Sequence, residues 1–238
     1  MVLGAVSGTR GDQREAIKHL KQALSINPNE WDAILWLLTV YYTAGKASAA
    51  WALADRLMEI DPLNPWTPFM RGVIYIQCEG RFDLAAELLQ RNRELLDLPF
   101  FRSYVAYALA GARRFKDALA LLGPIEPTSD QDAFSVQACL SWRLALQGRK
   151  EKMREVISSE YFATVRRDAG YSLITADLYA MLDDREQALD WLENAVNRGY
   201  INYPYLSEYD PFLSKLRSDP RFRKLMVRVK QEWERFEV

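Results

Sequence analysis

Two prolines, Pro28 and Pro62, lie 34 residues apart and close two similar phrases, and this repetition constrains the fold more than any other feature. Each phrase begins at a glycine, Gly11 or Gly45, and continues with Ala and Leu residues at three- and four-residue spacing. Apolar residues at that spacing form one face of an amphipathic helix, and a proline pushes the residue before it out of the helical region. A period of this length is typical of helix–turn–helix units that stack into a solenoid. The sequence therefore predicts stacked helix pairs, an architecture that favours a binding scaffold over an enzyme.

The repeated phrase resembles the tetratricopeptide repeat family, whose pattern alternates bulky and small residues over two helices. The second unit carries that pattern on the following residues: Ile34, Leu37, Leu38, Tyr41, Ala50, Ala54, Leu57 and Pro62. Further units, partly degenerate, continue to a clear last one around Tyr179 and Ala188. The resemblance implies an all-α, right-handed superhelical solenoid of about five to six helix pairs over residues 1–199, the first pair incomplete. A connecting segment and a C-terminal capping helix are expected over residues 200–238.

Glycines and aspartates mark the expected helix ends. Four glycines lie where a first helix must end, because glycine accepts positive φ without steric penalty: Gly11, Gly45, Gly80 and Gly148. The aspartates at 183 and 184 lie in an inter-helix turn, where an aspartate caps the helix that follows. Asp219 and Pro220 suit the first positions of a last helix for the same reason.

The C-terminal part carries two further phrases, Asp-Pro-Phe-Leu at residues 210–213 and Leu-Arg-Ser-Asp-Pro-Arg-Phe at residues 216–222. Together with the repeat before them, they resemble the end of the repeat arm in certain bacterial multidomain regulators. That resemblance implies an effector domain ahead of the repeats, which is a nucleotide cyclase, a winged-helix DNA-binding domain or a protein kinase. It does not distinguish among the three.

The sequence begins partway through a first helix, since Leu3 and Gly4 fall where the family has Leu-Gly. A solenoid needs polar caps at its ends, and a half-repeat leaves the apolar flank of Ile17, Leu20 and Leu24 poorly covered. We expect either that the natural chain starts upstream of residue 1 or that a partner covers this edge. A second copy of the chain, in a homodimer, is one such partner.

Charge and composition exclude several classes of function. The 31 Lys and Arg nearly balance the 32 Asp and Glu, so the net charge of -1 gives no general attraction to nucleic acid or to an anionic membrane. The longest apolar run, residues 33–42, is too short to span a bilayer, and the N-terminus lacks the pattern of a signal peptide. Two cysteines make no disulfide framework, which fits a reducing compartment. We expect a cytoplasmic protein that binds neither nucleic acid nor membrane through this part.

No group of residues points to catalysis, a cofactor or a metal. The single histidine, His19, has no Cys or Asp neighbour at ligand spacing. Cys78 and Cys139 lack a C-x-x-C partner and suit apolar packing. The acidic run at residues 183–186 lacks the spacing of a calcium loop, and the glycines before Gln13 lack the spacing of a phosphate-binding loop. We expect a non-enzymatic protein without catalytic, cofactor-binding or metal-binding residues.

The first helices carry the candidate partner-binding site, because in the family that the chain resembles these helices line a concave groove. Transferring the groove-facing places gives the candidate residues: Leu35, Thr39, Tyr42, Trp66, Phe69, Val73, Ile76, Tyr107, Trp142 and Asp177. One subfamily grips a peptide carboxylate with Lys, Asn and Arg at such places, but here most of them are apolar or aromatic. An apolar groove buries the side chains of a peptide helix or an extended segment, with Trp and Tyr as anchors.

The solenoid core is the alternative place for large aromatic residues, which dominate core burial. It is favoured for five of them: Trp36, Tyr41, Tyr75, Tyr179 and Trp191. Trp66, Phe69 and Trp142 suit the groove and the core about equally. The tyrosine-rich stretch over residues 200–209 has two interpretations, a loop or a segment that folds back onto the last repeat and fills the groove.

The sequence favours one function and leaves two alternatives open. The leading prediction is a non-catalytic protein-interaction scaffold, the regulatory or sensing arm of a larger bacterial signalling or transcription-regulating protein, which binds a peptide or a partner helix in the apolar groove. One alternative is a small-molecule sensor with an aromatic-lined pocket between Trp66, Phe69, Tyr107 and Trp142. The other is a structural homodimer joined through the N-terminal edge.

Overall fold

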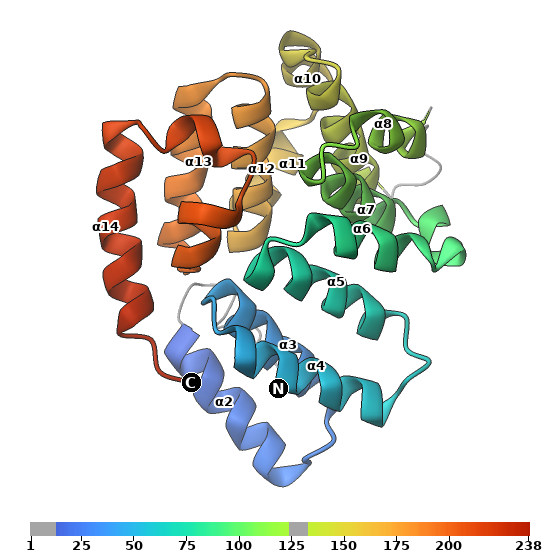
Figure 1. The fold of residues 1–238 in the computed structure, drawn as a ribbon, viewed down its shortest axis with the longest axis vertical. Helices are drawn as coiled ribbons and strands as arrows, with labels where there is room; N and C mark the ends of the chain where they lie inside the picture. Colours follow the sequence, from blue (N-terminus) through green and yellow to red (C-terminus); the bar gives the residue numbers. More distant parts are fainter. Residues whose placement is uncertain (1–12, 124–132) are drawn as a thin grey trace.

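Helices form all the regular secondary structure in residues 13–123 and 133–238, the part of the chain that the computed structural model describes (Figure 1). The first helices of the repeats are α3 (Trp31–Thr43), α5 (Trp66–Glu79), α7 (Pro99–Gly111), α9 (Ala133–Leu146) and α12 (Ala169–Met181). The second helices are α2 (Gln13–Ile26), α4 (Ala47–Ile60), α6 (Phe82–Gln90), α8 (Phe115–Leu122), α10 (Lys150–Val156) and α13 (Arg185–Asn197). The remaining elements are η1 (Arg93–Asp97), α11 (Ser159–Val165), η3 (Tyr205–Tyr209), η4 (Leu213–Leu216) and α14 (Pro220–Glu234). Neighbours along the chain pack together, so the predicted all-α solenoid of helix pairs is confirmed.

The helix ends follow the proline and glycine signals. α2 ends at Ile26 and α4 ends at Ile60, each two residues before a proline. Gly45, Gly80 and Gly148 adopt φ angles of +67°, +65° and +66°, the left-handed region that glycine enters without penalty. These three predicted turns are therefore confirmed, whereas Gly11 lies outside the described residues.

Aspartate caps fix the start of the last two long helices. Asp184 accepts a hydrogen bond from the Gln187 N–H at the start of α13, at 3.5 Å. Asp219 accepts one from the Arg221 N–H at 2.8 Å, with Pro220 in the first turn of α14. Both predicted caps are confirmed, and they set the direction in which the chain leaves the last repeat.

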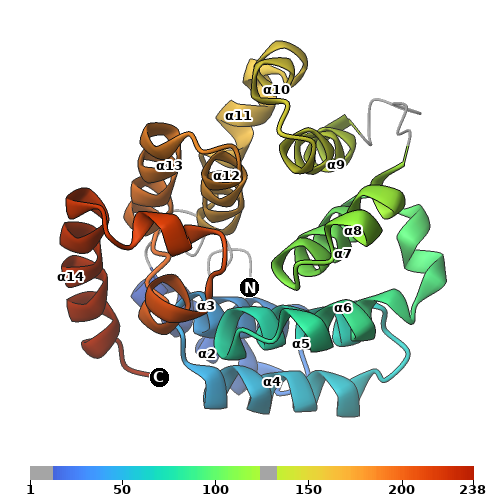
Figure 2. The same ribbon diagram turned by 45° about the horizontal axis from the view of Figure 1, so that its top comes forward.

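After α13 the chain returns across its own inner face, through residues 200–219, which we call the closing segment (Figure 2). The Ile201 N–H donates to the Thr43 carbonyl at 3.1 Å. The Asn202 side-chain amide donates to the carbonyls of Tyr42, at 2.9 Å, and Gln77, at 2.7 Å. Residues 160 apart in sequence are thus neighbours. The segment folds back as one interpretation predicted, but it reaches beyond the last repeat to α3 and α5 and closes the solenoid on itself.

The C-terminus of the chain lies beside α2, the helix at the N-terminal edge (Figure 1). Residues 235, 237 and 238 border the same surface hollow as Ile17 of α2, and Phe236 is buried. Leu20 is fully buried, while Leu24 is half-buried. The apolar flank expected to lie open is therefore covered at Leu20 and partly covered at Ile17 and Leu24, and the homodimer through this edge stays a prediction.

The aromatic residues assigned to the core divide into two groups. Tyr41, Tyr179 and Trp191 are buried, as predicted. Tyr75 is only half-buried, because it lies at the edge of α5 against Trp51, with ring centroids 5.0 Å apart. The core prediction was wrong for Trp36, which is half-buried and borders a cavity on the inner face.

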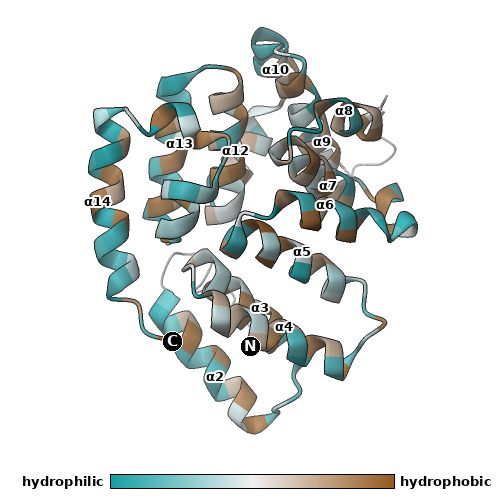
Figure 3. Cartoon of the chain, viewed as in Figure 1, coloured by the Kyte–Doolittle hydropathy of each residue, from teal (hydrophilic) through white to brown (hydrophobic). Residues whose placement is uncertain are grey.

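Hydrophilic residues dominate α14 at the edge of the solenoid, whereas hydrophobic residues recur along α5 and α7 (Figure 3). Among the described residues, none of the helices combines the length and the apolar character that a membrane span requires.

Candidate functional site

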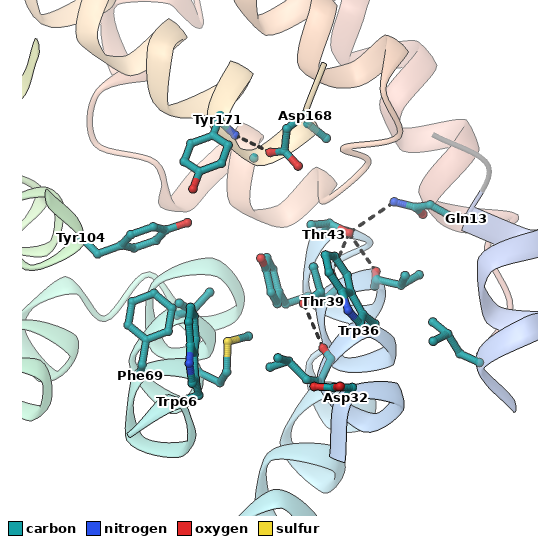
Figure 4. A pocket seen from close by; sticks show the side chains of 18 of the residues that line it. Gln13, Asp32, Trp36, Thr39, Thr43, Trp66, Phe69, Tyr104, Asp168 and Tyr171 are labelled. Carbon is teal, nitrogen blue, oxygen red and sulfur yellow. Dashed lines mark hydrogen bonds between the residues drawn. The ribbon is translucent and has the colours of Figure 1, made fainter. Parts of the chain in front are cut away.

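The inner face of the first repeats encloses a cavity of about 500 Å³. α3, α5, the beginning of α7 and the beginning of α12 supply most of its wall, and Gln13 and Leu20 of α2 with Arg198 at the end of α13 complete it. Figure 4 shows the side chains converging from these elements. Cavities of about 300–1,000 Å³ are typical of small-ligand sites, and this one also has room for a few side chains of a peptide.

Helical periodicity explains why α3 and α5 contribute so much of the wall. On α3 the lining residues are Trp31, Asp32, Leu35, Trp36, Thr39, Val40, Tyr42 and Thr43, and on α5 they are Trp66, Phe69, Met70 and Val73. Residues three and four apart share one face of a helix, so a single face of each helix looks into the cavity. The hydroxyls of Thr39 and Thr43 donate to α3 carbonyls at 3.0 Å and 2.9 Å, which leaves their methyl groups to form apolar wall.

Aromatic rings form one end of the cavity. Trp66 meets Phe69 edge-on at 5.4 Å and tilts against Phe100 at 5.5 Å. Tyr104 meets Phe69 edge-on at 4.9 Å. Each such ring pair contributes about 0.5–1.5 kcal/mol beyond simple burial, so the rings support one another around the open space.

The opposite end of the cavity is polar. Asp168 caps α12, with its Oδ1 accepting from the Tyr171 N–H at 2.8 Å (Figure 4). Burial raises the pKa of the Asp168 carboxyl, while the N–H groups of Tyr171 and Gly170 and the Arg198 charge oppose that rise. Gln13 donates from Nε2 to the Thr43 hydroxyl at 3.3 Å and to the Gly199 carbonyl.

Three tyrosines border the cavity with their phenol groups. Burial raises the pKa of Tyr42, Tyr104 and Tyr171, to about 12 in the case of Tyr171, and the nearby Asp168 charge adds to the rise. All three phenols are therefore protonated at neutral pH and can donate a hydrogen bond to a ligand.

Six of the ten predicted groove residues lie together in the cavity wall: Leu35, Thr39, Tyr42, Trp66, Phe69 and Val73. They belong to the second unit, which carries the family pattern clearly, and to the third, whose spacing has slipped by one residue. The structure thus brings these six side chains together around one open space, while the binding of a partner to them stays a prediction.

The other four predicted groove residues lie in the interior: Ile76, Tyr107, Trp142 and Asp177, each at most 2% exposed. The closing segment covers this part of the inner face. Phe212 stacks on Tyr107 and tilts against Trp142, with ring centroids 5.7 Å apart in both pairs. The hydroxyls of Tyr107 and Tyr205 share a hydrogen bond.

The small-molecule pocket predicted between Trp66, Phe69, Tyr107 and Trp142 is therefore corrected. Trp66 and Phe69 line the cavity, whereas Tyr107 and Trp142 face the closing segment. The four side chains do not share one open space in the described part of the chain, because Tyr107 and Trp142 contact each other, with ring centroids 5.3 Å apart, and Phe212 packs on both.

Asp177 and Asp210 form a buried acid pair where α12 meets the closing segment. Both are fully buried. Asp210 accepts from the N–H groups of Phe212, at 2.9 Å, and Leu213, at 3.4 Å, whereas neither oxygen of Asp177 has a partner within hydrogen-bond distance among the described residues. Burial raises the pKa of both carboxyls, and for Asp177 the neighbouring Asp210 raises it further. A proton held by Asp177 relieves the repulsion between them.

The sequence interpretation missed several lining residues of the cavity: Trp36, Phe100, Tyr104, Asp168, Tyr171 and Arg198. Trp36 lies three residues before the predicted Thr39, so the helical period of α3 was a signal for it. On α7 the residue that borders the cavity is Tyr104, three positions before the predicted Tyr107. Asp168 and Arg198 enter the cavity only through the closure of the solenoid, for which no local signal exists.

The described residues hold neither a metal-binding cluster nor a cysteine with a lowered pKa. Residues 13–123 and 133–238 hold no group of three or more His, Cys, Asp or Glu side chains able to bind a metal ion. Burial raises the pKa of the Cys78 and Cys139 thiols to about 12, so both are thiols and poor nucleophiles at neutral pH.

Comparison with known families agrees with the helix-pair geometry. Residues 9–65 match the tetratricopeptide repeat family. This part of the chain is a tetratricopeptide repeat region. Tetratricopeptide repeats generally mediate protein–protein interaction and are typically non-catalytic, which supports a scaffold role. The matched residues include α2, α3 and α4, and hence one wall of the cavity. A search of curated proteins gave no match to the chain.

Proposed function

We propose that this chain is the non-catalytic interaction arm of a larger, cytoplasmic bacterial signalling or transcription-regulating protein, and that a partner segment inserts side chains into the cavity. The tetratricopeptide match over residues 9–65 supports protein binding in general. The phrases at residues 210–213 and 216–222, which resemble the repeat arms of bacterial regulators, motivate the attachment to an effector domain.

The observation that carries the proposal is the open, aromatic-lined half of the inner face. Its wall belongs to packed helices and needs no ordering when a partner arrives, so the entropy cost of binding falls mainly on the partner. The closing segment offers an internal example of such binding, because it lies on the same face and bonds to the carbonyls of Tyr42 and Gln77. Trp66 and Phe69 are suited to anchor apolar side chains of a peptide.

Selection of a random peptide library against the chain tests the proposal. We expect peptides rich in large apolar residues, whose binding is lost in the variant Thr39→Arg, because the longer side chain fills the cavity. Lys116→Ala, on the exposed face of α8, is the matched control and should bind as the wild type does. Selected peptides that bind Thr39→Arg as tightly as the wild type would overturn the proposed site.

The attachment to an effector domain has its own test, the gene sequence upstream of the first codon. A reading frame that continues into a cyclase, kinase or winged-helix domain supports a regulatory arm. A stop codon and a ribosome-binding site just upstream would contradict that part of the proposal and leave a stand-alone adaptor.

The cavity volume favours a second candidate function, a small-molecule sensor. A space of about 500 Å³ with an aromatic end and a few polar groups lies within the range of small-ligand sites. A thermal-shift screen of metabolites tests this role, with Thr39→Arg as the variant that should abolish any shift. Shifts that persist in Thr39→Arg, or a screen without any shift, would contradict it.

A further inference from the structure

Two opposite charges line the cavity without pairing with each other. Asp168 and Arg198 both border the open space, yet neither makes an ion pair within 4.0 Å in the described part of the chain. Their charges still interact through space, since Arg198 lowers the pKa of the Asp168 carboxyl. An acid and a base that border the same cavity without an ion pair leave room for a ligand that carries the complementary pair of charges.

Hydrogen bonds at helix ends hold both charged residues in place. Asp168 is the N-cap of α12, and its Oδ1 is taken by the Tyr171 N–H. Its Oδ2 receives no side-chain donor in the described residues. Arg198 follows α13, where its N–H donates to the Asn194 carbonyl at 3.0 Å, while its guanidinium group makes no hydrogen bond there. The Arg198 guanidinium group and the remaining acceptor positions of the Asp168 carboxylate are therefore available to a ligand.

A third polar group at the same end also lacks a partner. The Oε1 atom of Gln13 is buried without a hydrogen bond among the described residues, while its Nε2 holds the side chain against Thr43 and Gly199. A buried acceptor without a donor destabilises the site, so a ligand that donates to it removes that penalty. Together with Asp168, this atom provides acceptors for an ammonium group.

The aromatic wall determines which side chain a ligand with a charged head can carry. Figure 4 places Asp168, Tyr171 and Gln13 at one end and Trp66 and Phe69 at the other. The protonated phenol of Tyr171 can donate to a carboxylate. The aromatic end suits a large apolar or aromatic group, because it buries apolar surface against rings already in contact. Asp32 is exposed at the rim, where water solvates its charge.

We propose that the cavity binds a free α-amino acid with a large apolar or aromatic side chain. Asp168 and Gln13 take its ammonium group, Arg198 takes its carboxylate, and its side chain lies against the Trp66 and Phe69 rings. A simple amine would leave Arg198 without a partner, and a simple carboxylic acid would leave Asp168 without one. Residues inside a peptide chain carry neither charge at their Cα. This inference rests on the small-molecule role proposed above and names its ligand class.

Calorimetric titration of the full chain with L-phenylalanine and three relatives tests the inference. Phenethylamine lacks the carboxylate, 3-phenylpropanoate lacks the amine, and N-acetylphenylalaninamide lacks both charges. We expect L-phenylalanine to bind and each relative to bind at least about tenfold more weakly, because each leaves a polar group of the site unpaired. Equal affinity for all four compounds would overturn the inference and leave an unselective apolar cavity.

Two variants that remove a charge test which residue binds the ammonium group and which binds the carboxylate. Asp168→Asn keeps the cap of α12, because asparagine caps a helix about as well as aspartate, but it removes the charge. It should bind L-phenylalanine no better than 3-phenylpropanoate. Arg198→Gln should bind L-phenylalanine no better than phenethylamine. Arg167→Gln, an exposed neighbour, is the control and should retain wild-type selectivity.

The outcomes separate this inference from the proposed function. Peptides that bind in the cavity while no amino acid does would sink the inference and leave the interaction role intact. An amino acid that binds equally to wild type and to Arg198→Gln would also sink it, because its carboxylate then has no partner at Arg198. Equal thermal midpoints of the unliganded variants establish that a loss of binding is not a loss of fold.

Discussion

The two halves of the inner face start from similar sequence and become opposite environments. On α5, Trp66 and Phe69 border an open cavity, whereas on α7 and α9 Tyr107 and Trp142 are sealed beneath Phe212. All four are aromatic residues of first helices, so composition and helical period do not separate them. The closing segment makes the difference, because it crosses one half and leaves the other open. Whether a groove residue is available to a partner is thus decided by a segment far away in the sequence.

The largest expected effect comes from removing the ring that seals the covered half. Phe212→Ala should lower the free energy of unfolding by about 3–5 kcal/mol, because it leaves a void among Tyr107, Trp142 and Phe82. Phe100→Ala in the open half should cost about 1–2 kcal/mol, since that half-buried ring already borders empty space. Urea unfolding of both variants measures the contrast. Equal losses would refute the distinction between the two halves.

The second prediction compares two glycines that share a left-handed backbone conformation but differ in whether the closing segment packs against them. Gly148→Ala should cost about 1–2 kcal/mol from the left-handed backbone alone, because no atom lies within 4 Å of the added Cβ. Gly80→Ala should cost about 1–3 kcal/mol more, because its Cβ would lie 2.9 Å from the Tyr209 Cβ in the closing segment. Urea unfolding of the two variants provides the measurement. If Gly80→Ala were no worse than Gly148→Ala, the closing segment would not press on α5 as described.

The buried acid pair predicts a pH dependence confined to the covered half. The folded-state pKa of Asp177 and Asp210 lies above the unfolded value, so their protonation stabilises the fold at low pH, and this contribution is lost as the pH rises through the folded pKa values. Asp177→Asn mimics the protonated acid. Above neutral pH it should stabilise the fold by about 1–3 kcal/mol, and the gain should vanish near pH 4.

Thermal unfolding of Asp177→Asn between pH 4 and pH 8 measures this effect. Asp97→Asn, an exposed aspartate of η1, removes the same charge at the surface and serves as the control. If Asp177→Asn lost stability at every pH, this would contradict the inference that Asp177 holds a proton in the folded state. A similar gain in Asp97→Asn would attribute the effect to net charge instead.

The smallest expected effect tests the contact between Lys46, which precedes α4, and Trp233 near the end of α14. Lys46 donates to the Trp233 carbonyl at 3.1 Å and lies over the Trp233 ring, 5.1 Å from its centroid. Lys46→Met should cost about 1 kcal/mol, the size of one hydrogen bond or one partly exposed cation–π contact. Faster hydrogen exchange at the end of α14 should accompany the loss. The exposed Lys116→Met should change neither quantity, and unchanged exchange in Lys46→Met would argue against this contact.

Much of the local structure was predictable, because its causes are local. The ends of α2 and α4 follow from the prolines after them, and Gly45, Gly80 and Gly148 mark turns that need positive φ. The six cavity residues on α3 and α5 could be predicted because a spacing of three and four residues places them on one face of each helix. The register on α7 could not be, since the spacing of the fourth unit is degenerate and a shift of three residues exchanges Tyr104 for Tyr107 as the lining residue.

The sequence by itself determined the class of fold, the helix pairs and the apolar inner faces, since these depend on periods of a few residues and on backbone preferences. The tertiary structure alone decided which part of the inner face stays open and which charges meet there. Asn202 reaches Tyr42 across 160 residues, and Asp168 faces the cavity of α3 and α5 only because the solenoid curves back on itself. Such contacts come from the summed packing of all the helices, so no short stretch of sequence encodes them.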